Sequence, residues 1–248
     1  MSGESMPGAE VWQDEGLVKR FLEGVRGGIP LLSVQLRMIR RMLRRIDFPV
    51  VQFLDLGCGD GILSATVLEE FPDAHGVLLD FSQAMLDAAH ERFEEWGKEL
   101  TFLKSDFSDP GWTAAAGEHA PFDAVISGFS IHHQPDKIKR QIYEQIFSLL
   151  RPGGIFLNNE HVLSPTQWIE NASDECFVDS LYLLHLKKGT GKSKEQVLHE
   201  FVHRPDKETN ILTLVEKQCD WLRDIGYEDV DCYFKIFELA VFGGRRPK

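Results

Sequence analysis

The sequence lacks the features of a membrane-bound or exported chain. Its 248 residues contain no apolar run that approaches the roughly 20 residues needed to cross a bilayer. The opening stretch, MSGESMPGAEVWQDEG, has neither the basic end nor the apolar segment of a secretion signal. We therefore expect a cytoplasmic protein that has no membrane partner.

Cysteine and positive charge are also scarce. The four cysteines, Cys58, Cys176, Cys219 and Cys232, show no C-x-x-C spacing, so we expect free thiols in a reducing compartment and no metal site. The 27 Lys and Arg residues against 39 Asp and Glu give a formal net charge of −12, which argues against nucleic acid as a partner. A local basic stretch, LRMIRRMLRRI, carries Leu and Ile at helical spacing and is typical of an amphipathic helix whose arginines face solvent.

Strand and helix patterns alternate along most of the chain. Apolar runs rich in β-branched residues predict strands at 50–56, 75–80, 100–106, 122–129 and 154–162, with helical patterns between them. This order predicts a parallel sheet with right-handed crossovers and helices on both faces. Two adjacent runs near the C-terminus, VDCYFKIF and ELAVFGG, predict an antiparallel pair at the sheet edge.

Two regions depart from this alternation and suggest a division of the chain. Residues 1–49 have helical patterns and precede the first strand, so we expect an N-terminal helical cap ahead of a core formed by residues 50–248. Residues of about 163–210 form a long polar insertion with two helical patterns, which we interpret as a lid over the site.

The run VVQFLDLGCGDG leads from a strand directly into three glycines, Gly57, Gly59 and Gly61. Ligands of open α/β sheets bind beyond the carboxyl ends of the strands, and glycine lets a backbone turn sharply there and approach a ligand closely. The spacing is G-x-G-x-G, not the G-x-G-x-x-G of nicotinamide enzymes, and no G-K-S/T follows that would hold a phosphate.

Three aspartates stand at successive strand ends. Asp55 precedes the glycines, where a carboxylate repels phosphate and attracts an ammonium or sulfonium group. Asp80 ends the second strand and can accept from both hydroxyls of a ribose, and Asp106 ends the third and can accept from a purine amino group. Amine, ribose and adenine are the recognisable parts of S-adenosylmethionine (SAM). Taken singly, Asp80 can instead cap a helix and Asp106 can be a turn residue; the joint pattern favours binding.

Five runs in order, FLDLGCGDG, GVLLDFSQAML, LKSDFSD, FDAVISGFSIHH and LLRPGGIFLNNEHV, resemble the class I SAM-dependent methyltransferases. The resemblance implies a Rossmann-like α/β fold with a mostly parallel seven-stranded sheet, an antiparallel edge strand and helices on both faces. It also implies SAM as cofactor and S-adenosylhomocysteine as product. The cofactor-binding residues that it implies are Asp55, Gly57, Cys58, Gly59, Asp80, Phe81, Met85, Asp106, Phe107 and Ser127.

A looser resemblance concerns a group of small bacterial methyltransferase-like enzymes. The stretch from IHHQPDKIKRQIYEQIF onward and the ending WLRDIGYEDVDCYFKIFELAVFGG are similar to this group, which is distantly similar to carboxy-SAM synthase. The glycine loop of that synthase differs from the G-x-G-x-G found here, so its activity is not carried over.

Methyl transfer from SAM is an in-line displacement that depends mainly on orientation and needs a general base only when the acceptor begins protonated. Candidate bases at the strand ends are His132, Glu160 and His161. For His133, a structural hydrogen bond at the start of the next helix is favoured over catalysis. The stretch SGFS stands where methyltransferases of bases and amides often carry N-P-P-Y, which disfavours that class.

Candidate substrate-binding residues come from the cap, the lid and the fourth strand. Aromatic residues at helical spacing are more often core than ligand contacts, and Arg26 has the specific alternative of pairing with a carboxylate of SAM or of the substrate. The set is Trp12, Arg26, Phe129, His133, Trp168 and Tyr182.

The sequence therefore predicts a SAM-dependent methyltransferase for a small-molecule acceptor. Alternatives are an enzyme of the same fold that uses SAM for carboxy-SAM formation or for cyclisation with release of methylthioadenosine, a tRNA or protein modifier, and a non-catalytic SAM-binding subunit. The sequence leaves the oligomeric state open, with a homodimer among the alternatives.

Overall fold

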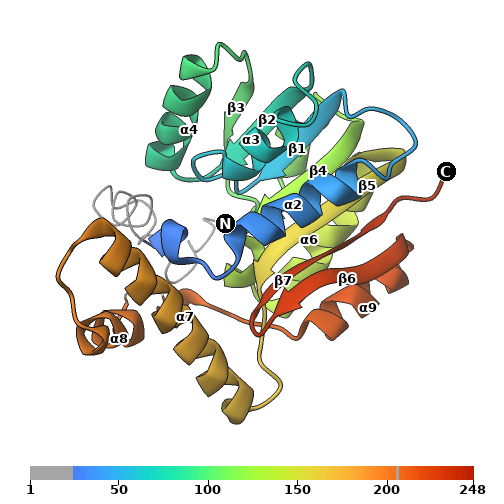
Figure 1. Cartoon of the computed structure of the whole chain (residues 1–248). Coiled ribbons are helices and arrows are strands. Elements are labelled where there is room, and N and C mark those ends of the chain that lie inside the picture. The colour runs from blue at the N-terminus through green and yellow to red at the C-terminus, as the bar shows by residue number, and fades with distance from the viewer. Residues whose placement is uncertain (1–24, 205–206) are drawn as a thin grey trace.

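The structure is a computed structural model that describes residues 25–204 and 207–248. One sheet has the strand order β3-β2-β1-β4-β5-β7-β6 (Figure 1). The bounds are β1 Gln52–Leu56, β2 His75–Asp80, β3 Thr101–Lys104, β4 Phe122–Gly128, β5 Leu150–His161, β6 Glu228–Ile236 and β7 Leu239–Arg245. Strands β1 to β5 are parallel, and β7 is antiparallel to both β5 and β6. The predicted mostly parallel seven-stranded sheet with an antiparallel edge is confirmed, and the reversed strand β7 lies just inside the outermost strand β6.

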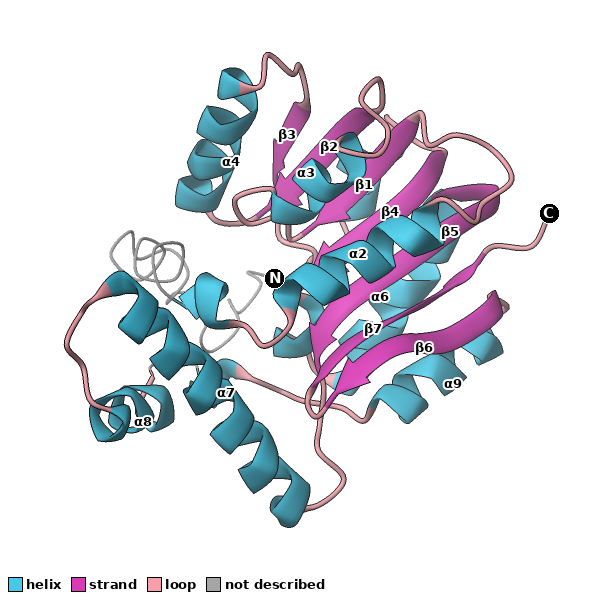
Figure 2. Ribbon diagram, viewed as in Figure 1, coloured by secondary structure: helices cyan, strands magenta, loops and turns pink. Residues whose placement is uncertain are grey.

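Helices cover both faces of the sheet (Figure 2). The helical elements are η2 Val25–Gly28, α2 Leu32–Leu43, α3 Ile62–Leu68, α4 Gln83–Glu95, α5 Trp112–Gly117, η3 Ile131–His133, α6 Asp136–Leu149, α7 Gln167–Lys188, α8 Lys194–Val202, η4 Lys207–Thr209 and α9 Val215–Ile225. Helices α2, α3 and α4 share an apolar cluster with Phe53 of β1, whereas α5, α6 and α9 share another with Leu54 and Leu56. Side chains alternate along a strand, so Asp55 belongs to the face that α2, α3 and α4 cover.

The basic stretch forms helix α2, which packs on the sheet. Ile39 and Leu43 are fully buried in the apolar cluster of that face. Most of the arginines are exposed, whereas Arg40 is half-buried, with its guanidinium 2.6 Å from the Glu69 carboxylate at the end of α3; the exposed ones are Arg37, Arg41, Arg44 and Arg45. The amphipathic interpretation of this stretch therefore agrees with the structure.

The insertion after β5 forms two helices that stand beside the sheet (Figure 1). Helix α7 begins at the Thr166 cap, whose hydroxyl accepts from the Ile169 amide, and ends at Gly189 in the left-handed conformation. Helix α8 packs on α7 through a small apolar cluster of its own. Over the described ranges, no helix combines the length and apolarity that a membrane crossing requires.

Residues 207–213, the returning segment, lead from α8 back to the core. The Thr209 carbonyl and hydroxyl lie 3.2 and 3.1 Å from His133 Nδ1, and the Ile211 amide donates to the His132 carbonyl. The ammonium of Lys139, a residue that is 1% exposed, donates to the Ile211 carbonyl and to the Thr213 hydroxyl. The returning segment is thus fixed against the end of the sheet from which the site opens.

Candidate functional site

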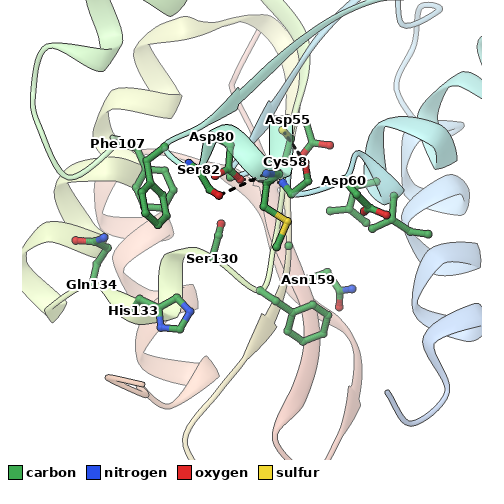
Figure 3. Close-up of a pocket in the computed structure, with 18 of the residues that line it drawn as sticks. Asp55, Cys58, Asp60, Asp80, Ser82, Phe107, Ser130, His133, Gln134 and Asn159 are labelled. Atoms are coloured by element: carbon green, nitrogen blue, oxygen red, sulfur yellow. Dashed lines mark hydrogen bonds between the residues drawn. The ribbon is translucent and has the colours of Figure 1, made fainter. Parts of the chain in front are cut away.

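A pocket opens at the carboxyl ends of β1, β2, β4 and β5 (Figure 3). Asp55, Asp60, Asp80 and Cys58 lie along one side, and His133, Gln134 and Asn159 lie along the other. The residues that line the pocket are Ile29, Leu32, Asp55, Gly57, Cys58, Gly59, Asp60, Ile62, Leu63, Asp80, Phe81, Ser82, Met85, Asp106, Phe107, Gly128, Phe129, Ser130, His133, Gln134, Asn159 and Thr209.

The glycine loop turns through left-handed backbone conformations. The φ angles of Gly57, Gly59 and Gly61 are 69°, 54° and 78°, values that favour glycine. A Cβ on Gly57 would lie 2.5 Å from the Ser130 Cβ, so a side chain does not fit there. A Cβ on Gly59 would meet only the Met85 sulfur, at 3.9 Å, among the described atoms. The backbone at Gly59 is therefore open to a ligand.

Asp55 is held at the base of the loop. One of its oxygens, Oδ2, accepts from the Ser64 amide at 3.0 Å and from the Ser64 hydroxyl at 2.6 Å. The other, Oδ1, is buried and has no hydrogen-bond partner among the described residues. Burial raises the pKa of Asp55 from 3.8 to about 7. This carboxyl can pair with a donor or a cation that enters the pocket.

Asp80 fixes the loop to the second strand. Its Oδ2 accepts from the Gly59 amide and its Oδ1 from the Ser82 amide, each at 2.9 Å. Ser82 in turn caps α4 by accepting from the Met85 amide. Burial raises the pKa of Asp80 to about 6. Since each carboxylate oxygen has two lone pairs, Asp80 can hold the loop and still accept from a ligand.

Arg92 braces the same loop from helix α4. Its Nε donates to the Asp60 carbonyl at 2.8 Å, and its guanidinium pairs with the Asp60 carboxylate. Cys58 lies beside them, where burial raises the pKa of its thiol well above the usual value. A neutral thiol is a poor nucleophile, so Cys58 serves here as a small side chain.

Asp106 and Phe107 line the pocket beyond β3. The Asp106 carboxylate accepts from the Ser108 amide at 2.8 Å, so the residue is a turn residue and a pocket residue at once. Phe81 and Met85 line the pocket as well. The structure therefore brings together nine of the ten residues expected to bind the cofactor.

Ser127 is the exception, since it is fully buried behind the lining. Its hydroxyl donates to the Leu56 carbonyl at 2.7 Å and lies 3.0 Å from the Ser130 hydroxyl. Ser130 lines the pocket in its place.

The three expected bases are buried or half-buried in η3 and at the end of β5. His132, Glu160 and His161 do not belong to the described lining. The His132 Nδ1 lies 2.6 Å from one Glu160 oxygen, and the His132 and His161 amides donate to the same carboxylate. Burial raises the pKa of Glu160 to about 7 and holds the pKa of His132 well below its usual value. This arrangement suits a structural pair better than direct contact with a substrate.

His133 lines the pocket, whereas its neighbour His132, which we expected to act as a base, does not belong to the described lining. The His133 ring lies 3.9 Å, between centroids, from the His132 ring. Phe129 also lines the pocket, in a left-handed conformation with φ of 50°, and its amide donates to the Asn159 carbonyl at 2.8 Å.

The remaining substrate candidates are not in the described lining. Trp168 is 77% exposed on α7, and Tyr182 packs against the apolar cluster between α7 and α8. Trp12 and the side chain of Arg26 lie outside the described residues.

The structure adds pocket residues that the sequence did not indicate. Gln134 and Asn159 are 4% and 1% exposed, and the amide oxygen of each is buried without a partner in the part of the chain that is described. Ile29 and Leu32 approach from the N-terminal side, and Thr209 from the returning segment. The position of Asn159 at the end of a strand was the one available signal.

Comparison with known proteins agrees with this geometry. Residues 53–154 match a family described as "Methyltransferase domain". Carboxy-S-adenosyl-L-methionine synthase of Nitratiruptor sp. is 21% identical over 92% of this chain and 90% of its own length. Trans-aconitate 2-methyltransferase of Variovorax paradoxus is 32% identical, over 48% of this chain and 42% of its own.

A solved structure shares the fold over most of the chain. Human N-acetylserotonin methyltransferase, in complex with SAM, superposes with a TM-score of 0.61 at 18% identity over 98% of this chain. The chain spans 61% of the length of that protein. At this identity the likeness concerns the fold.

Proposed function

We propose that this chain, which carries a class I SAM-dependent methyltransferase domain homologous to carboxy-SAM synthases, transfers the sulfonium methyl group of SAM to a small-molecule acceptor. The observation that carries the proposal is the assembly of the glycine loop and the acids of three strand ends around one pocket. When bound, SAM supplies a methyl group that the lone pair of an acceptor displaces in line, with S-adenosylhomocysteine as the product.

The residues present fit SAM. The Asp55 Oδ1, for which the described residues offer no donor, suits its ammonium group, and the open backbone at Gly59 allows close approach of the methionine part. Asp80 has accepting capacity left for ribose hydroxyls, and Asp106 with Phe107 suits the adenine.

The chain itself contributes orientation and exclusion of water. Ile29, Leu32, Leu63 and Phe129 give the pocket apolar walls. A well-oriented pair of reactants gains on the order of 7–11 kcal/mol over the same pair in solution. A base adds to this only for an acceptor that must lose a proton.

His133 is the residue that we propose to take that proton. The Thr209 carbonyl, 3.2 Å from Nδ1, can only accept, and the Thr209 hydroxyl, 3.1 Å from Nδ1, can accept as well, so we assign the proton of the neutral ring to Nδ1. Nε2 is then the basic nitrogen. This assignment replaces His132, Glu160 and His161 as the proposed catalytic groups, because those three are not among the described lining residues.

Replacement of His133 tests this role. For a hydroxyl acceptor, His133→Ala should lower kcat by roughly 10²–10⁴-fold without changing the Kd for SAM, and added imidazole should restore part of the rate. His75→Ala, at an exposed histidine outside the lining, is the control. A rate for His133→Ala equal to that of the control would refute the assignment.

Carboxy-SAM formation is the second candidate, favoured by the match to carboxy-SAM synthase over 92% of the chain. The two reactions give different products. Methyl transfer releases S-adenosylhomocysteine, whereas carboxy-SAM is a heavier derivative of SAM itself.

Mass spectrometry of the purified protein after mild denaturation tests the function first. Carried-over SAM supports the cofactor that both candidates share, S-adenosylhomocysteine supports methyl transfer, and carboxy-SAM supports the second candidate. No bound nucleoside, together with no calorimetric binding of added SAM, would refute both.

The cellular location, the domain division and the partners are also proposals. The four cysteines are unpaired in the described structure, which supports the reducing cytoplasm. The N-terminal cap over residues 1–49, the core over 50–248 and the lid over about 163–210 remain proposals, supported by helices α7 and α8. The net charge of −12 supports a small molecule over nucleic acid as the partner, and a homodimer is still to be tested.

A further inference from the structure

Negatively charged side chains outnumber positively charged ones among the described residues that line the pocket. Asp55, Asp60, Asp80 and Asp106 supply four carboxylates, and no Lys or Arg is found among its described lining residues. Arg92 pairs with Asp60 and is itself not part of this lining. When SAM, with a single net positive charge, is bound, the negative charges still exceed the positive ones.

The polar groups opposite the carboxylates are neutral amides. Gln134 and Asn159 each bury an amide oxygen for which the described structure offers no donor. An unsatisfied buried polar atom is unfavourable, so a ligand that donates a hydrogen bond there is favoured. If either amide is turned over, the buried atom becomes a donor, and a hydroxyl group satisfies it equally well.

The rest of the wall is apolar. Ile29, Leu32, Ile62, Leu63 and Phe129 surround the space between the carboxylates and the amides. Such a wall suits a ligand with an apolar body and few polar groups.

We propose that the acceptor is a neutral or cationic small molecule with an apolar body and hydroxyl or amino donors, and not a carboxylic acid. This inference rests on the proposed function and specifies its substrate class. A carboxylate would enter a pocket beside Asp55, Asp80 and Asp106, whose charges no Lys or Arg of the described lining neutralises, and like charges repel. The chain would then differ in substrate charge from the relative named for trans-aconitate, which is a tricarboxylic acid.

Three probes that carry the same hydroxyl pair and differ in net charge test this substrate class. Catechol, dopamine and 3,4-dihydroxybenzoate are neutral, cationic and anionic carriers of the same hydroxyl pair. Their binding to the full chain saturated with S-adenosylhomocysteine is measured at pH 8 by ligand-observed NMR. We expect catechol or dopamine to bind at least tenfold more tightly than 3,4-dihydroxybenzoate.

Calorimetry with S-adenosylhomocysteine alone comes first and separates the two proposals. Its failure to bind would refute the proposed function. If it binds, but 3,4-dihydroxybenzoate binds as tightly as its partners, or if no probe binds, the substrate class is wrong. Tight binding of trans-aconitate that Arg26→Ala abolishes would overturn the class in the same way and identify the missing cation.

A charge added to the wall provides a second test. Leu32→Arg places a guanidinium in the lining and should shift the preference toward 3,4-dihydroxybenzoate by at least tenfold. Leu31→Arg adds the same charge at the preceding residue, which is 50% exposed and outside the lining, and should leave the preference unchanged. Equal shifts in the two variants, or a shift in neither, would contradict the proposal.

Discussion

Asp55→Asn should stabilise the ligand-free protein at pH 8 and weaken its binding of SAM. The Asp55 side chain is buried, receives two hydrogen bonds from Ser64 and has one oxygen without a partner among the described residues. The negative charge that this carboxyl carries at pH 8 is therefore poorly compensated until a cationic ligand arrives. Asparagine keeps the shape and removes the charge.

The magnitude follows from the pKa. Burial raises it from 3.8 to about 7, and each unit corresponds to about 1.4 kcal/mol, which gives an upper limit of about 4 kcal/mol. The amide NH₂ of the variant replaces a bare oxygen and lacks an acceptor, at a cost of about 1–3 kcal/mol. The net gain is about 2 kcal/mol, or an increase in Tm of about 4–8 °C for a chain of this size.

The sign of the pH dependence is fixed by the same shift. The folded pKa lies above the unfolded value, so the folded state binds the proton more tightly and the wild type loses stability as pH rises from about 4 through 7. The gain in Tm of Asp55→Asn should therefore grow as the pH rises from 5 to 8. At pH 5 the cost of the amide group should offset the small loss of stability of the wild type, so no gain is expected there. The affinity of the wild type for SAM should fall about tenfold from pH 8 to pH 6 through Asp55 alone, and the variant should lose this dependence.

Thermal unfolding and calorimetry across pH 5–8 measure both effects. Asp73→Asn, at an exposed aspartate outside the lining, is the matched control. A variant that is less stable than the wild type at pH 8, or whose gain does not change with pH, would refute the reasoning.

Two further substitutions test the loop and the returning segment. Gly57→Ala should weaken SAM binding at least tenfold, because the added Cβ would overlap Ser130. The control is Gly97→Ala, where φ is 61° and the described structure has nothing near the added Cβ. It should cost only about 1 kcal/mol of stability and leave SAM binding unchanged. Lys139→Met should lower the free energy of unfolding by about 1–3 kcal/mol and raise the KM of the acceptor, because the returning segment loses its buried donor. Lys137→Met, at an exposed neighbour, should change neither quantity. Equal values for a variant and its control, by calorimetry or steady-state kinetics, would contradict the corresponding prediction.

Much of the fold was predictable because the strands are continuous apolar runs. The expected strand over 75–80 has the same bounds as β2, since His75 and Asp80 delimit an apolar run in the sequence as they do in the sheet. Strand β5 begins at Leu150, earlier than the expected residue 154, because Leu150 pairs with Phe122 across a register irregularity. The R-P-G-G sequence is typical of a turn and conceals this pairing.

The acidic side of the pocket was predictable for a geometric reason. The residues that follow parallel strands meet at one edge of a sheet, so Asp55, Asp80 and Asp106 came together from their positions alone. Gln134 and Thr209 come from segments whose placement depends on tertiary packing, and no local pattern marked them.

The histidine doublet shows a different limit. His132 and His133 are neighbours in a 3₁₀ helix, and their ring centroids lie 3.9 Å apart. Their partners differ, since the His132 ring contacts Glu160 whereas the His133 ring lines the pocket. The sequence could not indicate which of the two does so.

The returning segment limits how this enzyme can acquire new specificity. Surface insertions vary in sequence between relatives and are natural units for exchange. Here the chain that leaves the insertion of helices α7 and α8 also supplies Thr209, which contacts the ring of His133. A chimera cut before Thr209 would keep this contact, whereas one that replaced residues 163–213 would have to bring its own partner for the histidine. Exchange of α7 and α8 would thus leave this contact intact. Exchange of the returning segment, where the chain rejoins the sheet, would remove it.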